Sequence, residues 1–434
     1  MKLLCLGAGF NQLNAIRKAK SKGYTIIVSD YLPDAPGKRW ADHAELVSTF
    51  DVEANIAVAK KYAVDGVFTI GTDQPVYTAA CVAEALGIQH MITPWTALRA
   101  TNKKYMKECF KANHIPCSKH CFISKEELSD WEHLQNKLSQ LHFPVVIKPL
   151  DSQGQRGIYK IPELRSDISS YMKDTFAYTR SDEIIVEEFF PGDEITVSAW
   201  IEGDKTHIFM VTDRPLINIE PHLGTPDGHI FPSKYWPVHQ KTIYSLVDKI
   251  SRGFKIDNGP LYIQMMVHDE EIQVVEIACR IGGGHEEELI PLVTGVDAVD
   301  LFIDLAAGKK IDLTNFSPLN PCENDRYAMV KFIVARPGMV DHCGEMEQIK
   351  SLDGVVNAGF YHPEMERVEQ LVDSTKRIGY LLVEGKDSED LLRKTRSAYQ
   401  RLQVINPQGE NLVVDTRDPD SIYRIYRLKE MMGL

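Results

Sequence analysis

The sequence lacks a hydrophobic run of the length needed to cross a membrane. A spanning helix needs about 18 or more consecutive apolar residues, and no segment of the 434-residue chain approaches that length. The N-terminal stretch MKLLCLGAGF has one lysine and a short apolar run but no small-residue cleavage site, so it predicts a first strand rather than a signal peptide. We therefore expect no membrane partner.

Positive charge is also scarce. The 49 lysines and arginines are outnumbered by 61 acidic residues, which gives a net charge of −12 at pH 7. A broad basic surface for nucleic acid is therefore not expected, although a local anion site is compatible with this balance. Hydrophobic residues make up 44% and charged residues 25%, which excludes a mainly disordered or fibrous chain. At roughly 100–200 residues per domain, the length predicts two to four domains.

Paired cysteine motifs are absent, since none of the eight cysteines belongs to a CxxC pair. Such pairs are the usual sequence signal of zinc-binding and redox sites. Several cysteines lie in apolar or helical surroundings, so we expect all of them to be free thiols in a reducing compartment. This predicts a cytoplasmic protein.

The first part of the chain alternates between short apolar strands and helical stretches. Gly87 follows the last of these helices, at the position where glycine commonly ends a helix. The alternation predicts a parallel sheet with crossover helices. The expected strands are 2–6, 24–29, 44–48 and 66–70, and the expected helices are 10–20, 53–63 and 76–86.

Gly7 and Gly9 follow the first strand, and Asp30 follows the second. This spacing is similar to the fingerprint of dinucleotide-binding domains, which indicates NAD as one interpretation. The third fingerprint glycine is replaced by Gln12, which would hinder close approach of the helix and the pyrophosphate. A tight strand-to-helix turn without a cofactor is therefore favoured over an NAD site.

The middle of the chain begins with a helix predicted over 95–112, which contains Lys103. A strand at 143–148 then leads into the polar loop 151–157 and a second strand at 158–161. Glycines in such a flap allow backbone N–H groups to face an anion, with Lys148 beside them. The phosphate-binding pattern GxxxxGK[ST] is absent, and a plain surface hairpin is an equally good interpretation.

A further strand is predicted at 183–188 and ends in Glu187-Glu188. After the turn at 189–194, strand character resumes at 195–201. A strand end beside an apolar pocket would offer backbone groups to a purine edge, and Glu194 would accept from ribose hydroxyls. The alternative is a solvated turn with charged ends.

A hairpin is predicted from strands 261–267 and 272–277, with Gln264 on the first and Glu276 inside the second. An unpaired buried carboxylate costs several kcal/mol, so a cation should compensate Glu276. A divalent ion with oxygen ligands or Arg280 are the two candidates. Arg280 leads into three glycines and a helix that opens with acidic residues, an arrangement suited to binding an anion.

In this order, these segments resemble the ATP-grasp superfamily, and most closely its L-amino-acid ligases, which join a carboxylate to an amine. The likeness covers residues 1–310 and is less specific in the C-terminal part. The motifs that carry it are Lys103, VIKP at 146–149, the flap SQGQRG at 152–157, VEEFFPGDE at 186–194, GHIFPS at 228–233, the Gln264–Glu276–Arg280 hairpin and RIGGG at 280–284.

The resemblance implies an α/β protein with three parts. Residues 1–94 would form a Rossmann-like N-terminal domain. Residues 95–325 would form an ATP-grasp fold, in which two α+β lobes clasp ATP and the flap lobe covers about 116–196. Residues 326–434 would form a small α+β C-terminal domain associated with these ligases.

The resemblance also implies roles for ten ATP-binding residues. Two lysines would hold phosphates, a loop would close over them, two glutamates and a phenylalanine would line the adenine pocket, and a third glutamate would bind ribose. These residues are Lys103, Lys148, Ser152, Gln153, Gly154, Gly157, Glu187, Glu188, Phe190 and Glu194.

For the reaction itself, the resemblance implies ATP and Mg²⁺ as cofactors, with Gln264 and Glu276 as metal ligands. Arg280 would stabilise an acyl phosphate and its tetrahedral successor, and would bind substrate with Gly282 and Gly283. His229 would be a catalytic base, with His285 as the other candidate. The substrates would be a small carboxylate and an amine, expected to be amino acids, and a homodimer is common among such proteins.

One residue departs from the family pattern. These enzymes usually have asparagine two residues after the metal-binding glutamate, and this sequence has Ala278, which offers no ligand. The departure keeps a catalytically silent ATP-binding protein open as an alternative. A carboxylase-like or purine-pathway ATP-grasp enzyme is a second alternative, although no bicarbonate or ribonucleotide signature is visible.

Overall fold

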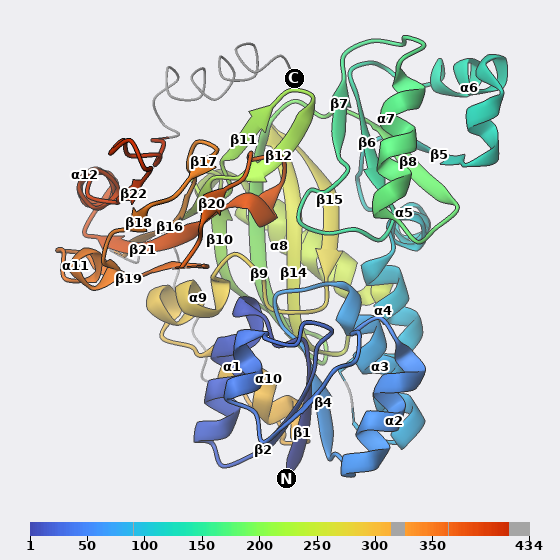
Figure 1. Ribbon diagram of the computed structural model, residues 1–434. Coiled ribbons are helices and arrows are strands. Elements are labelled where there is room, and N and C mark those ends of the chain that lie inside the picture. Colours follow the sequence, from blue (N-terminus) through green and yellow to red (C-terminus); the bar gives the residue numbers. More distant parts are fainter. Residues whose placement is uncertain (90, 314–325, 363, 416–434) are drawn as a thin grey trace. The chain divides into compact units, whose positions relative to one another are not determined.

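The computed structural model describes residues 1–89, 91–313, 326–362 and 364–415, which form two compact units (Figure 1). Unit 1 holds residues 1–118 and 195–211 and continues from 234, and unit 2 holds 119–194 and 212–233 and the C-terminal part. The three predicted domains, at 1–94, 95–325 and 326–434, stay predictions.

Unit 1 opens with a parallel sheet of strand order β3-β2-β1-β4, which confirms the predicted crossover pattern. Leu4, Ile27 and Val67 are buried in its core beneath α2 and α3. The elements are β1 (Lys2–Leu6), α1 (Phe10–Ser21), β2 (Thr25–Ser29), a 3₁₀ turn at Pro36–Arg39, β3 (His43–Glu45), α2 (Val52–Tyr62), β4 (Gly66–Phe68) and α3 (Gln74–Leu86).

The helix predicted over 95–112 is instead two helices, α4 (Pro94–Thr101) and α5 (Lys103–Ala112). Asn102 between them has extended backbone angles, and its side chain accepts a hydrogen bond from the Lys104 amide at 3.0 Å. Asparagine caps a helix in this way because its side chain satisfies an amide that lacks an intrahelical partner. The prediction of one continuous helix was therefore wrong, and Lys103 begins the second helix.

Four more strands of unit 1 follow the order β15-β14-β9-β10. Strands β14 and β15 form the predicted antiparallel hairpin. Its register runs from Tyr262 opposite Ala278 to His268 opposite Glu271. The elements are β9 (Asp193–Glu202), β10 (Lys205–Asp213), α8 (Trp236–Phe254), β14 (Asn258–His268), β15 (Glu271–Ala278), α9 (Glu286–Thr294) and α10 (Ala298–Ala306).

Unit 2 contains a sheet of order β11-β12-β7-β6-β8-β5. Strands β6 and β7 pair antiparallel around the polar loop, which confirms the predicted flap hairpin. The elements are β5 (His120–Ser124), a 3₁₀ turn at Glu126–Ser129, α6 (Trp131–Leu138), β6 (Val145–Pro149), β7 (Tyr159–Ile161), α7 (Ile168–Thr175), a 3₁₀ turn at Phe176–Tyr178, β8 (Glu183–Glu188), β11 (Leu216–Ile219) and β12 (His222–Pro226).

The C-terminal part of unit 2 adds the antiparallel order β13-β16-β21-β19, covered by two helices that pack on β19 and β21 (Figure 1). Two short strand pairs, β17–β20 and β18–β22, complete it. The elements are β13 (Gly228–Phe231), β16 (Tyr327–Ile333), β17 (Gly338–Met339), β18 (His342–Cys343), α11 (Met346–Lys350), β19 (Val355–Phe360), β20 (Arg367–Val368), η4 (Ser374–Lys376), β21 (Gly379–Gly385), α12 (Ser388–Tyr399) and β22 (Val404–Ile405).

Two predictions from composition can be compared with the described residues. The seven cysteines among them are free, as expected, and Cys322 lies outside the described part of the chain. No described helix combines the length and the hydropathy that crossing a membrane requires.

Candidate functional site

In unit 1, the β14–β15 hairpin brings Gln264 and Glu276 directly opposite each other. Lys103, the first residue of α5, places its Nζ 3.3 Å from Oε2 of Glu276. The Lys103 side chain is 13% exposed and that of Glu276 26%, so both lie near the surface of this unit without being fully solvated. The cation beside Glu276 is therefore Lys103, and the interpretation of a plain Glu276–Arg280 pair was wrong.

Arg280 binds Asp73 instead. Its Nε lies 2.7 Å from Oδ1 of Asp73 and its Nη2 lies 2.5 Å from the same atom. Nη1 donates to the Ile281 carbonyl at 3.1 Å, and the guanidinium carbon lies 5.0 Å from the centre of the Tyr262 ring. Burial lowers the pKa of Arg280, but the charge and hydrogen bond of Asp73, together with Tyr262 and Glu286, outweigh burial and raise this pKa above its usual value, so Arg280 is held cationic.

Asp73 is a residue of this site that the sequence interpretation missed. It follows β4, and polar residues at the carboxyl ends of parallel strands are a usual signal of a binding site. The link is reinforced because the Gly71 amide donates to the Ile281 carbonyl at 3.1 Å. Residues that follow the last strand of the first sheet, Gly71 and Asp73, thus hold Arg280, the residue predicted to be catalytic.

The glycines after Arg280 allow the Glu286 side chain and the Gly71 backbone to pack closely against this turn. A Cβ on Gly283 would lie 2.4 Å from the Gly71 carbonyl oxygen, and one on Gly282 would lie 2.3 Å from the Glu286 carboxylate. The Gly284 amide donates to Oε2 of Glu286 at 2.5 Å. This amide, expected to be bare for an anion, is therefore already bonded to a carboxylate of its own chain.

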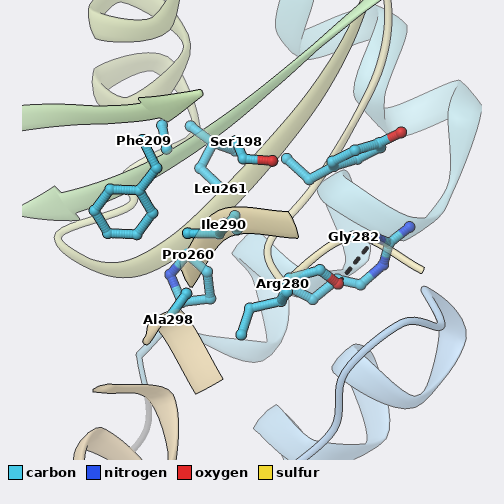
Figure 2. A pocket seen from close by; sticks show the side chains of 11 residues that line it. Ser198, Phe209, Pro260, Leu261, Arg280, Gly282, Ile290 and Ala298 are labelled. Carbon is cyan, nitrogen blue, oxygen red and sulfur yellow. Dashed lines mark hydrogen bonds between the residues drawn. The ribbon is translucent and has the colours of Figure 1, made fainter. Parts of the chain in front are cut away.

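A small cavity of about 10 Å³ lies beside Arg280 and Gly282, with Ser198, Leu261 and Ile290 among its lining residues (Figure 2). This is about the smallest space that holds one water molecule. The Ser198 hydroxyl is buried and has no hydrogen-bond partner among the described residues. The cavity is too small for an amino acid, so it does not define a substrate pocket.

At the start of α9, three further side chains meet. His285 Nδ1 lies 3.1 Å from Oε1 of Glu288 and 3.6 Å from Oε1 of Glu287. Their three potential ligand atoms lie within 4.8 Å of one another, which is compatible with a metal ion. A hydrogen bond within the first turn of the helix explains the same grouping.

Replacing Glu287 by glutamine is expected to raise the melting temperature by about 2–4 °C at pH 8 and by less at pH 5. Burial raises the pKa of the Glu287 carboxyl well above its usual value of 4.5, and the charge of Glu288 adds to this. The folded state therefore keeps a proton that the unfolded chain loses, so stability falls as pH rises from about 4.5 through the raised pKa. The glutamine amide in the variant has no such proton to lose.

Thermal unfolding of the Glu287→Gln variant at both pH values measures this effect. Glu270→Gln, in the exposed turn of the β14–β15 hairpin, is the matched control. An equal change in melting temperature at both pH values would show that ionisation of Glu287 is not the cause.

In unit 2, Lys148 on β6 and Glu187 on β8 form a buried ion pair. Nζ of Lys148 lies 2.6 Å from Oε2 of Glu187, and their side chains are 14% and 5% exposed. The two strands are neighbours, with Val146 opposite Glu187, so the pair is made across adjacent strands. Glu187, predicted to line an adenine pocket, therefore also holds the lysine predicted to bind phosphate.

Glu188 faces a different partner, because successive side chains of a strand point to opposite faces. Its Oε1 accepts from the His142 amide at 2.9 Å and lies 3.0 Å from His142 Nδ1. Its amide donates to the Lys119 carbonyl. The side chain of Glu188 thus holds the loop before β6, and the adenine contact expected of this residue stays a prediction.

Glu194 at the start of β9 is also paired. Its carboxylate accepts from Nη1 of Arg214, and the two side chains are 8% and 6% exposed. The Arg214 amide donates in turn to the Glu194 carbonyl at 2.8 Å. Arg214 was not identified from the sequence, and the ribose-binding role of Glu194 stays a prediction.

The flap loop 151–157 is held at both ends. Oδ1 of Asp151 accepts from the Thr179 hydroxyl at 2.5 Å and from the Arg180 amide at 3.2 Å. Gly157 has a φ of +68°, and a Cβ there would lie 2.6 Å from the Tyr178 ring, so only glycine fits. The half-buried Ser152, Gln153 and Gly154 lie between these ends.

His229 lies in strand β13 and is 2% exposed. Its Nδ1 is 3.3 Å from the Thr212 hydroxyl, and its ring packs edge-on to Phe332. The neighbouring Asp227 pairs with the buried Lys331. His229 is thus a packed strand residue here, and its role as a base stays a prediction.

The groups that would bind a dinucleotide near the N-terminus are engaged within unit 1. Asp30 accepts from the Ala8 and Leu32 amides, each at 2.8 Å. Gln12 accepts from the Gly9 amide at 3.1 Å and donates to the Ile70 carbonyl at 2.6 Å. These contacts fit the favoured interpretation, a tight strand-to-helix turn.

The predicted site residues therefore form one set in each unit. Unit 1 holds the proposed metal ligands with one lysine, the arginine and the glycine turn, and unit 2 holds the other lysine, the flap, the strand-end acids and His229. In unit 1 these residues are Lys103, Gln264, Glu276, Arg280, Gly282 and Gly283, and in unit 2 they are Lys148, Ser152, Gln153, Gly154, Gly157, Glu187, Glu188, Phe190, Glu194 and His229.

Comparison with known families identifies two regions of the chain. Residues 141–287 match the ATP-grasp domain, and residues 331–406 match the L-amino acid ligase C-terminal domain 2. Both matches confirm the resemblance seen in the sequence motifs.

Individual relatives extend this likeness over most of the chain. This chain is 21% identical over 374 residues to the L-arginine-specific L-amino acid ligase of Bacillus subtilis. The alignment covers 83% of this chain and 86% of that protein. The crystal structure of an L-amino acid ligase from Bacillus licheniformis superposes with a TM-score of 0.75 at 17% identity, covering 93% and 98% of the two chains.

A third similar structure is the biotin carboxylase domain dimer of the Hydrogenobacter thermophilus 2-oxoglutarate carboxylase, in complex with MgADP, ADP and bicarbonate. Its TM-score is 0.72 at 17% identity, and it covers 100% of this chain and 95% of that one. At such identities the structural likeness shows the ATP-grasp fold, which confirms the predicted fold class.

Proposed function

We propose that this chain, which carries an ATP-grasp domain and an L-amino acid ligase C-terminal domain, forms an amide or peptide bond between two amino acids through an acyl phosphate, using ATP and Mg²⁺. The observation that carries the proposal is the cross-strand pair Gln264 and Glu276 with Lys103 beside it. The names of the L-amino acid ligases among its relatives support the choice of amino acids as substrates. A homodimer and a cytoplasmic location stay predictions.

The donor set of the hairpin suits magnesium. Mg²⁺ prefers oxygen ligands, keeps several waters and takes phosphate oxygens readily, so one carboxylate and one amide oxygen from the protein are sufficient. Gln264 and Glu276 would hold the ion, which would neutralise charge on the phosphates of ATP. Ala278, at 4% exposure, adds no ligand, so a second ion would rest on fewer protein groups.

The two lysines are each held against a glutamate, Lys103 against Glu276 and Lys148 against Glu187. A lysine in such a pair is oriented before the triphosphate binds. Phosphoryl transfer depends mainly on positioning and charge neutralisation, which these residues supply. The flap would exclude water, and Glu187, Glu188, Phe190 and Glu194 would bind the nucleoside.

In the reaction, a carboxylate oxygen of the first substrate attacks the γ-phosphorus, and the β–γ bridging bond breaks to release ADP. The amine of the second substrate then attacks the acyl carbon and phosphate leaves. Arg280, fixed and cationic through Asp73, stabilises the developing oxyanion, with Gly282 and Gly283 beside it. His229 is the candidate acceptor of the amine proton.

Replacing Glu276 by alanine is expected to lower ADP release at least about 100-fold, because the metal ion loses its carboxylate ligand. ADP release is measured over a panel of amino acid pairs, with bicarbonate and ribonucleotide acceptors included for the carboxylase and purine-pathway alternatives. Glu270→Ala, in the turn of the same hairpin, is the control. Unchanged ADP release in the Glu276→Ala variant would refute the metal role.

The alternative raised by Ala278, an ATP-binding protein without catalytic activity, can be tested separately. Calorimetric binding of ATP by the wild-type protein, together with no ADP release over the whole panel, would favour that alternative over a ligase. ADP release that depends on two amino acids would exclude it.

A further inference from the structure

The middle of the flap is bonded to the C-terminal part of unit 2. The Gly154 carbonyl accepts two hydrogen bonds from Ser374, one from its amide and one from its hydroxyl, both at 3.0 Å. A carbonyl oxygen has two lone pairs, so both bonds can be made at once. The two residues lie 220 positions apart in the sequence, so the contact is purely tertiary.

The short helix η4 that begins at Ser374 is held by residues before and after it. The carboxylate of Asp373, at 7% exposure, accepts from the Thr375 amide at 2.8 Å and the Thr375 hydroxyl at 2.6 Å. Nε of Arg377 donates to the Ser374 carbonyl at 2.9 Å, and its guanidinium stacks 3.6 Å from the centre of the Phe332 ring. Phe332 is fully buried in β16, so η4 is tied to the core of the C-terminal part.

The flap backbone is unusual where Ser374 holds it. Gly154 and Gln155 have φ values of +73° and +62°, and left-handed angles are costly for a residue with a side chain such as glutamine. The end of the loop is anchored within its own lobe, where the Thr175 hydroxyl donates to the Gly157 carbonyl at 3.0 Å. The bonds from Ser374 therefore hold the flap at the point where its backbone has left-handed angles.

We propose that Ser374 is a positioning residue that holds the flap in the conformation described above and so couples ADP formation to amide formation. This inference rests on the proposed function. An acyl phosphate reacts with water at its carbonyl carbon, which releases phosphate and returns the free carboxylate. A flap that opens more often admits that water, so each ADP yields less amide.

The first test measures ADP and amide product from the same reactions. Ser374→Ala removes the hydroxyl bond and keeps the amide bond, and it is expected to raise the ratio of uncoupled ADP to amide about fivefold. That factor equals about 1 kcal/mol at 1.4 kcal/mol per tenfold change, the usual net value of one hydrogen bond. Ser374→Thr, which keeps a hydroxyl, is expected to restore coupling.

Ser351→Ala is the matched control. Its hydroxyl donates to the Gln348 carbonyl at 2.7 Å within the same C-terminal part, so the variant also loses one serine-to-carbonyl bond, but a local and exposed one away from the flap. Coupling in this variant is expected to equal that of the wild type. A ratio that rises equally in both alanine variants would overturn the proposal, because general loosening of the domain would then be the cause.

A second measurement does not depend on catalysis. Arg156 lies inside the flap, and cleavage there by trypsin, mapped by mass spectrometry without nucleotide, reports flap opening. Faster cleavage in Ser374→Ala alone, about fivefold, supports the anchor even if no variant forms amide, in which case only the proposed function fails. Unchanged cleavage, or faster cleavage with unchanged coupling, overturns the inference.

Discussion

Replacement of Lys148 by methionine is expected to abolish ADP formation and to lower the free energy of unfolding by about 3–5 kcal/mol. Activity is lost because the lysine no longer holds a phosphate of ATP. Stability is lost because the carboxylate of Glu187, with a side chain only 5% exposed, is left without its ammonium partner. Chemical denaturation and ADP release measure the two effects separately.

The double variant Lys148→Met with Glu187→Gln separates the structural role from the functional one. Replacing both charged partners leaves no unpaired buried charge, so most of the stability is expected to return. ADP formation is expected to stay absent. Recovery of ADP formation together with stability would mean that Lys148 serves only the fold.

Replacement of Arg280 by glutamine is expected to lower the rate of amide formation by about 100- to 1,000-fold, mainly in kcat. The guanidinium is buried, cationic and fixed by Asp73, so it is preorganised for a developing negative charge. Steady-state kinetics of ADP and amide formation measure the effect. The KM for ATP is expected to change little, because the lysines and the metal ion hold the phosphates.

Asp73→Asn is the companion variant for Arg280. It keeps the guanidinium but weakens its fixation, so a smaller loss in kcat is expected than in Arg280→Gln. The combined variant Arg280→Gln with Asp73→Asn is expected to unfold at a higher temperature than Arg280→Gln alone, because the half-buried carboxylate of Asp73 no longer lacks its guanidinium partner. Equal activity of Arg280→Gln and the wild type would remove Arg280 from the catalytic role.

The local part of the candidate site was predictable from the sequence. Alternation along two apolar strands placed Gln264 and Glu276 on one hairpin, and the structure pairs them in register. The glycines around the polar loop predicted a flap between two antiparallel strands. These features depend on neighbours in sequence, whose geometry is set by the period of a strand and the reach of a turn.

The choice of charged partners was not predictable in the same way. Arg280 lies four residues from Glu276 but binds Asp73, and Glu276 binds Lys103. These partners come from separate elements, and only tertiary packing decides which of them meet. Charge alone showed that Glu276 needs a cation without showing which one.

The break between α4 and α5 has a local cause that periodicity hides. The apolar pattern continues across Asn102, but this side chain caps the second helix at the Lys104 amide. Asparagine in the middle of a helical pattern was the available signal. The break matters for the site because it places Lys103 in the first turn of α5.

Transfer of oxygen-18 from the substrate to phosphate tests the central claim most directly. Amino acids carrying ¹⁸O in both carboxylate oxygens are incubated with the protein, ATP and Mg²⁺, and the released phosphate and nucleotide are analysed by mass spectrometry. An acyl-phosphate mechanism predicts one ¹⁸O atom in each phosphate formed with ADP. Phosphate without ¹⁸O, or ¹⁸O found in AMP, would contradict a ligase that activates its carboxylate at the γ-phosphoryl group.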